Sequence, residues 1–214
     1  MKKLLFILPL FLLPLMKVQA QDTKAKAILD GVCAQTKTYT TIEIEFSYTM
    51  ENKKKNMKET KKGTACMKGD KYWLSFAGQT LISDGKTTWT YIKESNEVQI
   101  NNVNTGDDQS LNPSKLLTAY DKSFTPKFIK EEVRTGKTLQ ILDLTPLKSR
   151  SYYKIRVEID KVQKQIANSI VYDKDGATTY TYSVSKFTTN KAIADTKFTF
   201  KTSDYPGVEV VDLR

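Results

Sequence analysis

The hydrophobic pattern of the chain changes from a helical period to a strand period near residue 40. In residues 22–37 the apolar side chains recur at helical spacing, and Asp22 is placed to cap the first turn. In residues 40–51 apolar and polar residues alternate, which predicts a half-buried strand. The sequence therefore predicts an amphipathic helix that leads into a sheet. The apolar stripe of this helix is Ala25, Ile28, Leu29, Val32 and Cys33.

Short alternating segments recur through the rest of the chain and predict about ten further strands. Turn sequences such as "SDGK" and "DKDGA" separate several of them, and residues 81–100 indicate two strands around a two-residue Asp-Gly turn. One interruption, residues 110–120, predicts a helix in which Asn112 is the cap and Pro113 the first helical residue. Strands at this spacing predict an antiparallel sheet or barrel, curved around the two helices.

Residues 1–20 have the three parts of a secretory signal. They comprise a basic start, an apolar run from Leu4 to Met16, and a small-residue cleavage site ending at Ala20. The run is shorter than the roughly 20 apolar residues that span a bilayer. Residue Gln21 stands where a lipid-anchored protein would have cysteine. We expect residues 21–214 to be exported as one domain that is not tethered by a lipid.

The charge and the two cysteines exclude few of the possible functions. The formal net charge is +10, and the densest lysine run, residues 53–62, lies between two alternating segments. This run predicts a solvated hairpin tip, and the chain shows no nucleic-acid-binding motif. Cys33 falls on the helical stripe and Cys66 in a predicted strand. A disulfide and two small buried side chains are both open interpretations.

The sequence holds little that could catalyse a reaction. It contains no histidine, which removes the commonest general base and the commonest zinc ligand. Glu43 and Glu45 are a candidate glycosidase pair, but both fall on the polar face of their strand, where we expect them to be solvated. Residues 105–110 lack the ligand spacing of a calcium loop. We therefore expect no catalytic residue, no metal site and no cofactor.

The apolar faces of the strands have two interpretations. They can form the core of a plain β-sandwich, or they can line the concavity of a curved sheet that holds an apolar ligand. Alternation alone assigns the face of each residue, so one strand can be assigned to the wrong side. With two leucines of the second helix, the candidate lining residues are Phe46, Tyr48, Met50, Tyr72, Leu74, Phe76, Leu81, Trp89, Tyr91, Leu116 and Leu117.

The stretch "LISDGKTTWTYIKESNEVQI" resembles the central signature of the periplasmic outer-membrane lipoprotein carrier family, LolA. Three further pieces agree in order. They are the first helix leading into a strand with Phe46, the "NPSKLL" helix, and the ending "TKFTFKTSDYPGVEVVDLR". The resemblance implies a mainly β fold, namely an open, unclosed antiparallel β-barrel of about eleven strands with helices covering its concave face.

The resemblance also implies a function. It predicts a monomeric periplasmic carrier that takes lipoprotein acyl chains from an inner-membrane ABC transporter and delivers them to an outer-membrane acceptor. Other interpretations remain: carriage of another lipid, a glycan-binding or protein-binding module with Trp73 and Trp89 as an exposed platform, and a hydrolase.

The chain departs from the family at one point. Family members often have Lys-Arg-Pro before the aromatic strand, with the arginine latching the lid, and here the corresponding residues are Lys68, Gly69 and Asp70. Lys68 or Lys71 could substitute, but a lysine lacks the planar fork of arginine. This departure predicts a looser lid or a different cargo.

Overall fold

The computed structural model describes residues 16–103 and 120–214. One long helix, one short helix, two 3-10 turns and twelve strands make up the described part. The helical elements are α1 (Met16–Lys37), α3 (Tyr120–Ser123), η1 (Asp195–Phe198) and η2 (Thr202–Asp204). The first six strands are β1 (Ile42–Asn52), β2 (Met57–Lys68), β3 (Lys71–Phe76), β4 (Gln79–Ser83), β5 (Thr87–Ile92) and β6 (Glu97–Asn102). The other six are β7 (Phe124–Arg134), β8 (Lys137–Pro146), β9 (Tyr152–Asp160), β10 (Gln165–Asp173), β11 (Thr178–Thr189) and β12 (Glu209–Asp212).

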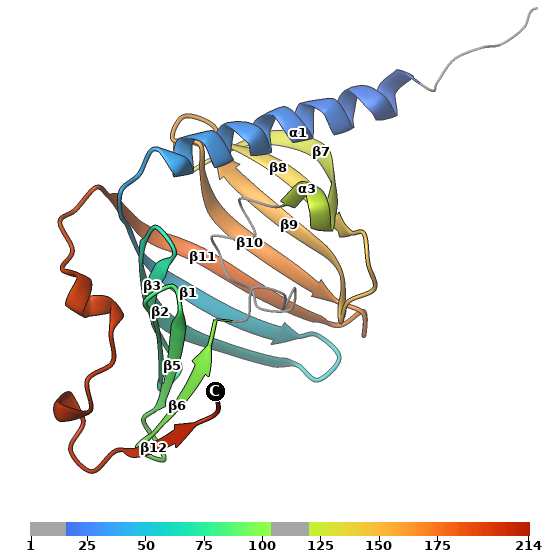
Figure 1. Cartoon of the computed structure of the whole chain (residues 1–214). Helices are drawn as coiled ribbons and strands as arrows, with labels where there is room; N and C mark the ends of the chain where they lie inside the picture. Colours follow the sequence, from blue (N-terminus) through green and yellow to red (C-terminus); the bar gives the residue numbers. More distant parts are fainter. Residues whose placement is uncertain (1–15, 104–119) are drawn as a thin grey trace, which may run out of the picture.

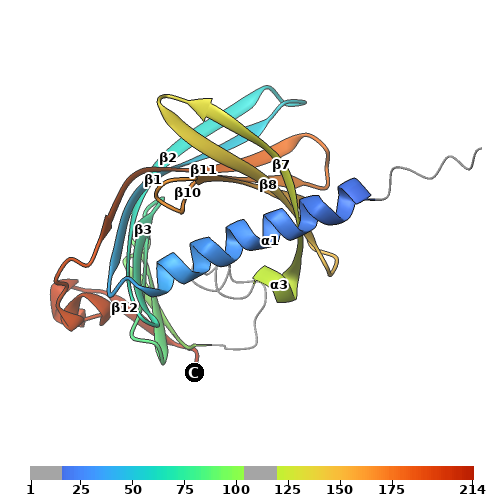
Figure 2. The same cartoon turned by 90° about the horizontal axis from the view of Figure 1, so that it is seen from above.

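All twelve strands belong to one open sheet, in the order β12-β6-β5-β4-β3-β2-β1-β11-β10-β9-β8-β7. It consists of two meanders, β1–β6 and β7–β11, which meet where β1 pairs with β11. The sheet curls strongly but does not close, because β12 and β7 form its two ends (Figure 2). The predicted open antiparallel barrel is confirmed. One pair departs from it, because β12 runs parallel to β6.

Helix α1 lies across the concave side of the curled sheet (Figures 1 and 2). The predicted apolar stripe is confirmed: Ala25, Leu29 and Val32 are buried, and Ile28 and Cys33 pack against the same core. Because these side chains recur every three or four residues, they form one face that covers β7–β10. The buried residues on the sheet side of this core are Phe124, Leu142, Leu144, Ile155, Val157, Ile159 and Val171.

The ends of the helices differ from the prediction. Helix α1 begins at Met16, so Asp22 lies inside it and does not cap its first turn. No proline or glycine lies between these two residues to stop the helix. The helix predicted at residues 110–120 lies outside the described residues except for Tyr120, the first residue of α3. Within the described ranges, none of the helices is long and apolar enough to cross a membrane.

The last part of the chain, residues 190–214, passes over the outer, convex side of the sheet (Figure 1, red). We call it the C-terminal segment. Asp195 holds its first part, because the Nζ atoms of Lys68 and Lys71 lie 2.7 and 2.8 Å from the two carboxylate oxygens. Its final strand, β12, hydrogen-bonds to β6. The concave and convex sides of the sheet are therefore covered by different ends of the chain.

Candidate functional site

The concave side carries a set of apolar residues beyond the area that α1 covers. Cross-strand pairing places them on one face, since partners in an antiparallel pair point to the same side. We call this set the concave cluster: Phe46, Tyr48 and Met50 of β1, Tyr72, Leu74 and Phe76 of β3, Leu81 of β4, and Tyr180 and Tyr182 of β11.

Tyr48 is the centre of the concave cluster. Its ring centroid lies 5.2 Å from that of Phe76 on one side and 5.2 Å from that of Tyr182 on the other. Tyr180 stacks on Tyr48 at 6.2 Å, and Phe46 lies 5.8 Å from Phe76. These are favourable separations for aromatic pairs. The rings therefore form one continuous apolar surface across the junction of the two meanders.

Gly63 in β2 gives the rings room to meet. It pairs with Phe46 on one side and with Phe76 on the other. A Cβ atom at Gly63 would lie 2.5 Å from Cζ of Phe46 and 3.0 Å from the carbonyl oxygen of Ser75. Any side chain here would therefore push the Phe46 ring off the strand, so glycine shapes this part of the surface.

The concave side thus has two zones. Under α1 the side chains are buried and form a dry core, whereas every member of the concave cluster is half-buried. Tyr180 and Tyr182 belong to both, because they also pack against the core under α1. Burial raises the pKa of Tyr48 and of Tyr182, so these phenols are neutral at ordinary pH. The half-buried zone is an apolar surface next to a buried core, with the Lys61–Glu59 ion pair of β2 beside it.

The expectation that Trp89 and Tyr91 line the concavity is wrong. Leu81 pairs with Thr90, whereas Trp89 pairs with Ile82 on the other face. Four residues, 84–87, lie between the last paired residues, Ser83 and Thr88, and the carboxylate of Asp84 accepts hydrogen bonds from the backbone N–H groups of Lys86 and Thr87. An even number of residues, whether these four or the expected two, pairs odd with even residue numbers, so Trp89 lies on the face opposite to Leu81. The expectation that both point inward was therefore inconsistent with the expected turn itself.

Trp89 and Tyr91 instead help to anchor the C-terminal segment. Tyr91 lies 4.4 Å from Tyr205 between ring centroids, and Tyr205 stacks on Phe200 at 4.5 Å. The ammonium group of Lys197 lies 3.5 Å above the ring of Trp73. Because the C-terminal segment packs on these rings, Trp73 and Trp89 do not form the exposed platform that glycan binding would need.

Two other expectations concern the lid and the lining. Leu116 and Leu117 lie outside the described residues. Lys68 and Lys71, which could have replaced the latching arginine, instead hold Asp195 of the C-terminal segment. Helix α1 is instead connected to α3, because the hydroxyl of Tyr120 in α3 donates a 2.7 Å hydrogen bond to Oδ1 of Asp30 in α1. This bond lowers the pKa of the Asp30 carboxyl.

Sequence reasoning missed three residues of this site, namely Gly63, Tyr180 and Tyr182. The alternation of "TTYTYSVSKF" predicts that the two tyrosines share a face. It could not show that β11 lies beside β1, because that pairing joins opposite ends of the chain. The isolated glycine inside β2 was the available signal for a close approach by other residues.

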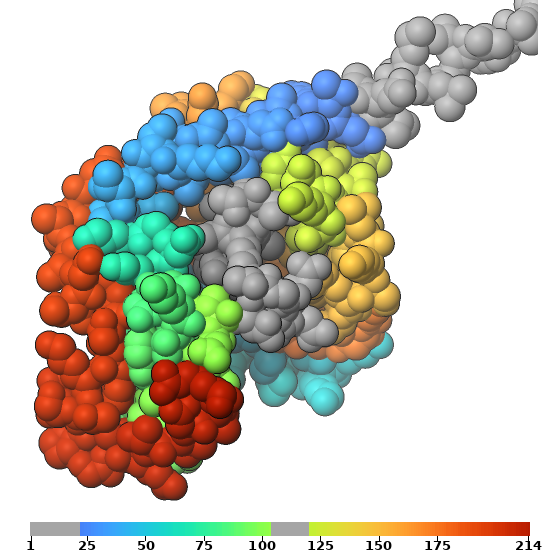
Figure 3. Space-filling model, viewed as in Figure 1, coloured from blue at the N-terminus to red at the C-terminus, as the bar shows by residue number. Residues whose placement is uncertain are grey.

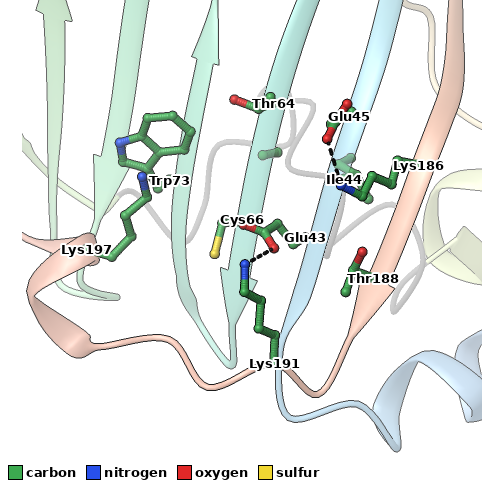
Figure 4. Close-up of a pocket in the computed structure, with 11 residues that line it drawn as sticks. Glu43, Ile44, Glu45, Thr64, Cys66, Trp73, Lys186, Thr188, Lys191 and Lys197 are labelled. Carbon is green, nitrogen blue, oxygen red and sulfur yellow. Dashed lines mark hydrogen bonds and ion pairs between the residues drawn. The ribbon is translucent and has the colours of Figure 1, made fainter.

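A hollow of about 270 Å³ lies on the convex side of the sheet (Figure 4). It is lined by charged groups that pair with one another: Glu43 with Lys191 and Glu45 with Lys186, each at 3.2 Å. The two glutamates therefore lie on the polar face, as expected, with lysines as partners. Such a charged hollow does not suit an acyl chain.

The cysteines lie on different sides of the sheet. Cys66 lines the convex hollow, whereas Cys33 lies on α1 over the concave side, and the two do not form a disulfide with each other. Burial raises the pKa of the Cys66 thiol, which makes it a poor nucleophile. In the ranges that the structure describes, no group of three or more acidic, cysteine or histidine side chains could hold a metal ion.

Comparisons with known proteins agree with this architecture. A solved structure of an uncharacterized conserved protein from Thermus thermophilus superposes with a TM-score of 0.61 at 13% identity, covering 88% of this chain and 99% of that one. A putative outer membrane lipoprotein-sorting protein domain from Vibrio parahaemolyticus gives 0.49 at 13% identity, with 83% and 97% covered.

At 13% identity the superposition on the Thermus thermophilus protein shows the fold alone. None of the curated proteins compared with the chain matches it. The sequence profile of the family described as "Outer membrane lipoprotein carrier protein LolA" matches residues 37–201, which is most of the chain. The protein therefore belongs to the LolA family of outer membrane lipoprotein carrier proteins.

Proposed function

We propose that this protein is a periplasmic carrier that shelters the acyl chains of a lipoprotein on the concave cluster while the lipoprotein moves between membranes. The observation that carries the proposal is the continuous half-buried apolar surface that runs from β3 across β1 to β11. Family membership supports the same activity. Residues 21–214 are the carrier, monomeric and free of cofactors, and residues 1–20 direct its export.

The physical need for a carrier follows from the cost of exposing an acyl chain to water. A chain of about 16 carbons costs roughly 12 kcal/mol at about 0.8 kcal/mol per methylene. A lipoprotein with two or three chains therefore does not leave a membrane unaided. A carrier that bound these chains as well as a bilayer does would never release them.

The concave cluster suits weak, adaptable binding. Flat rings and the thioether of Met50 accept many chain conformations. An inner-membrane ABC transporter would supply the energy for loading, and a more apolar acceptor at the outer membrane would take the cargo. Carriage of another acyl lipid would use the same surface.

The test compares one aromatic residue from each side of the sheet. Phe76→Asp places a charge in the concave cluster, whereas Tyr153→Asp places one on the outer side, where Tyr153 lies beside Tyr172. We expect the first variant to lose uptake of a fluorescent fatty acid at least tenfold and the second to bind like the wild type. Burying an unpaired carboxylate against an acyl chain is costly enough to produce this loss.

Two further readouts identify the cargo and its position. Native mass spectrometry of the protein purified from its own periplasm should find an acylated species at about one to one. A brominated fatty acid should quench tyrosine emission in a Trp73→Phe/Trp89→Phe variant, and should leave tryptophan emission of the wild type unchanged. A protein that is empty and also takes up no fatty acid, or uptake that survives Phe76→Asp, would overturn the proposal.

A further inference from the structure

The two ends of the sheet carry very different surfaces. Because successive strands are antiparallel, the β1–β2, β8–β9 and β10–β11 connections lie at one end, and the β7–β8 and β9–β10 turns lie at the other. We call the first end the basic rim and the second the balanced rim. The basic rim comprises Lys53, Lys54, Lys55, Lys58, Lys148 and Lys174, with the apolar residues Met57 and Leu147.

Hydrogen bonds tie the three connections of the basic rim together. The Nζ of Lys54 donates to the carbonyl oxygen of Asp175 at 3.2 Å, and the backbone N–H of Lys53 donates to that of Ala177. The Nζ of Lys174 donates to Oγ of Ser149 at 2.8 Å. Lysines from three separate parts of the chain are therefore held on one surface, and the β1–β2 tip projects at its margin (Figure 3, cyan).

The lysines of the basic rim are not neutralised. Within the described residues, none of the six has a carboxylate oxygen within 4.0 Å of its ammonium group. Asp173 and Asp175 of the β10–β11 connection keep their negative charge, and the carboxylate of Asp175 accepts hydrogen bonds from the backbone N–H groups of Ala177 and Thr178. Because six lysines face these two carboxylates, the basic rim presents a net positive charge.

The balanced rim provides the contrast inside the same molecule. Four of its cations have partners: Lys130 with Glu132 at 2.6 Å, Arg134 with Glu158 at 2.8 Å, Lys137 with Asp160 at 3.6 Å and Lys161 with Glu131 at 2.8 Å. Of the two rims, the basic rim therefore carries more unpaired positive charge.

Lysines often protect the open edge of a sheet from pairing with other strands, but this role explains only part of the basic rim. Strand β3 pairs with β2 from Gly63 onward, so residues 57–62 of β2 form an open edge, and lysines on an open edge prevent strand-to-strand aggregation. That role accounts for Lys58. It does not account for the three turn lysines, nor for Lys148 and Lys174, which lie on other connections.

The apolar residues of the basic rim indicate the partner. Met57 is 43% exposed and Leu147 is 57% exposed, and both lie among the lysines. Lysines attract anionic headgroups, and exposed aliphatic side chains gain free energy by entering the headgroup region. The structure points to an anionic lipid bilayer as the partner: we propose that the basic rim docks this protein on a membrane surface.

This inference goes beyond the proposed function, because it concerns a different surface and holds whatever the concave cluster binds. The test is cosedimentation of the full chain with vesicles of phosphatidylcholine containing about 30% phosphatidylglycerol. We expect binding at about 0.05 M salt, little binding at about 0.5 M salt, and little to pure phosphatidylcholine.

Lys53→Gln/Lys54→Gln/Lys55→Gln should reduce vesicle binding at least tenfold, since each lysine near an anionic surface contributes about fivefold. The matched control, Lys130→Gln/Lys161→Gln/Lys164→Gln, removes the same charge at the opposite end and should bind within twofold of the wild type. Met57→Ser/Leu147→Ser should weaken binding severalfold, whereas Val133→Ser/Val162→Ser should not, although those two valines are 74% and 84% exposed.

Two results would overturn the proposal. One is a wild-type protein that ignores anionic vesicles at low salt yet is retained by immobilised polyglutamate, which would assign the basic rim to an acidic protein. The other is an equal loss in both triple-lysine variants, which would mean that net charge alone attracts the protein. Fatty acid uptake, measured in the same variants, should be unchanged and so keeps this test separate from the carrier test.

Discussion

At the scale of single residues, two glycines differ in whether the structure has room for a side chain at their position. Gly63 lies under the Phe46 ring with no space for a side chain, whereas at Gly31 in α1 a Cβ atom would meet only the Cδ of Lys164, at 4.0 Å. The first glycine is needed for packing, and the second only lowers the stability of its helix. The sequence marks both as isolated glycines inside regular elements and does not distinguish them.

Alanine at each position should separate these roles. Gly63→Ala should lower the free energy of unfolding by about 1–3 kcal/mol, because the Phe46 ring must move. It should also weaken fatty acid uptake. Gly31→Ala should raise the free energy of unfolding by about 0.5–1 kcal/mol. Urea denaturation measures both, and a neutral Gly63→Ala would show that Phe46 does not depend on this close approach.

At the scale of elements, alternation and helical spacing predict what each segment forms but not which face it presents. The α1 stripe was predictable because five apolar residues at helical spacing leave one choice of face. Trp89 was assigned to the wrong face although the expected turn already gave the right one, because any turn with an even number of residues puts Trp89 and Leu81 on opposite faces. The outer position of the C-terminal segment was also hidden, since it rests on Asp195 meeting two lysines that lie far away in the sequence.

That contact predicts a pH-dependent element. Lys68 and Lys71 lower the pKa of Asp195 to about 2, against about 3.9 in an unfolded chain. Because the folded value is the lower one, the stabilisation is present above about pH 4 and disappears as the pH falls toward 2. The C-terminal segment should therefore loosen in acid, and Asp195→Asn should loosen it at neutral pH.

Tryptophan emission measures this loosening, since Trp73 and Trp89 both lie under the C-terminal segment and are the only tryptophans. Asp175→Asn is the control. The pKa of Asp175 is also lowered to about 2, but its carboxylate holds the β10–β11 turn, away from both indoles. An acid transition in emission that survives Asp195→Asn unchanged would show that this ion pair does not hold the segment.

At the scale of the whole molecule, the chain combines one sheet with two unlike coverings. Helix α1 covers part of the concave side with a buried core and leaves the concave cluster half-buried, whereas the C-terminal segment covers Trp73, Trp89 and Tyr91 on the convex side. Evenly spaced strands predicted an antiparallel sheet or barrel, and the resemblance to the LolA family implied that the barrel is open. The meeting of Tyr180 and Tyr182 with Tyr48 was not predictable, because it depends on the pairing between distant strands.

The junction of the two meanders has a consequence for how the protein matures. β1 pairs with β11, and Asn52 and Thr178, which share a hydrogen bond there, are 126 residues apart. Each meander can form from neighbouring hairpins early in folding, but this junction must wait until β11 has reached β1. Until then the Phe46–Tyr48–Met50 edge is unpaired and is open to pairing with other strands. Pulsed hydrogen exchange during refolding should protect the β3–β4 amides before those of β1 and β11, and simultaneous protection would exclude this order.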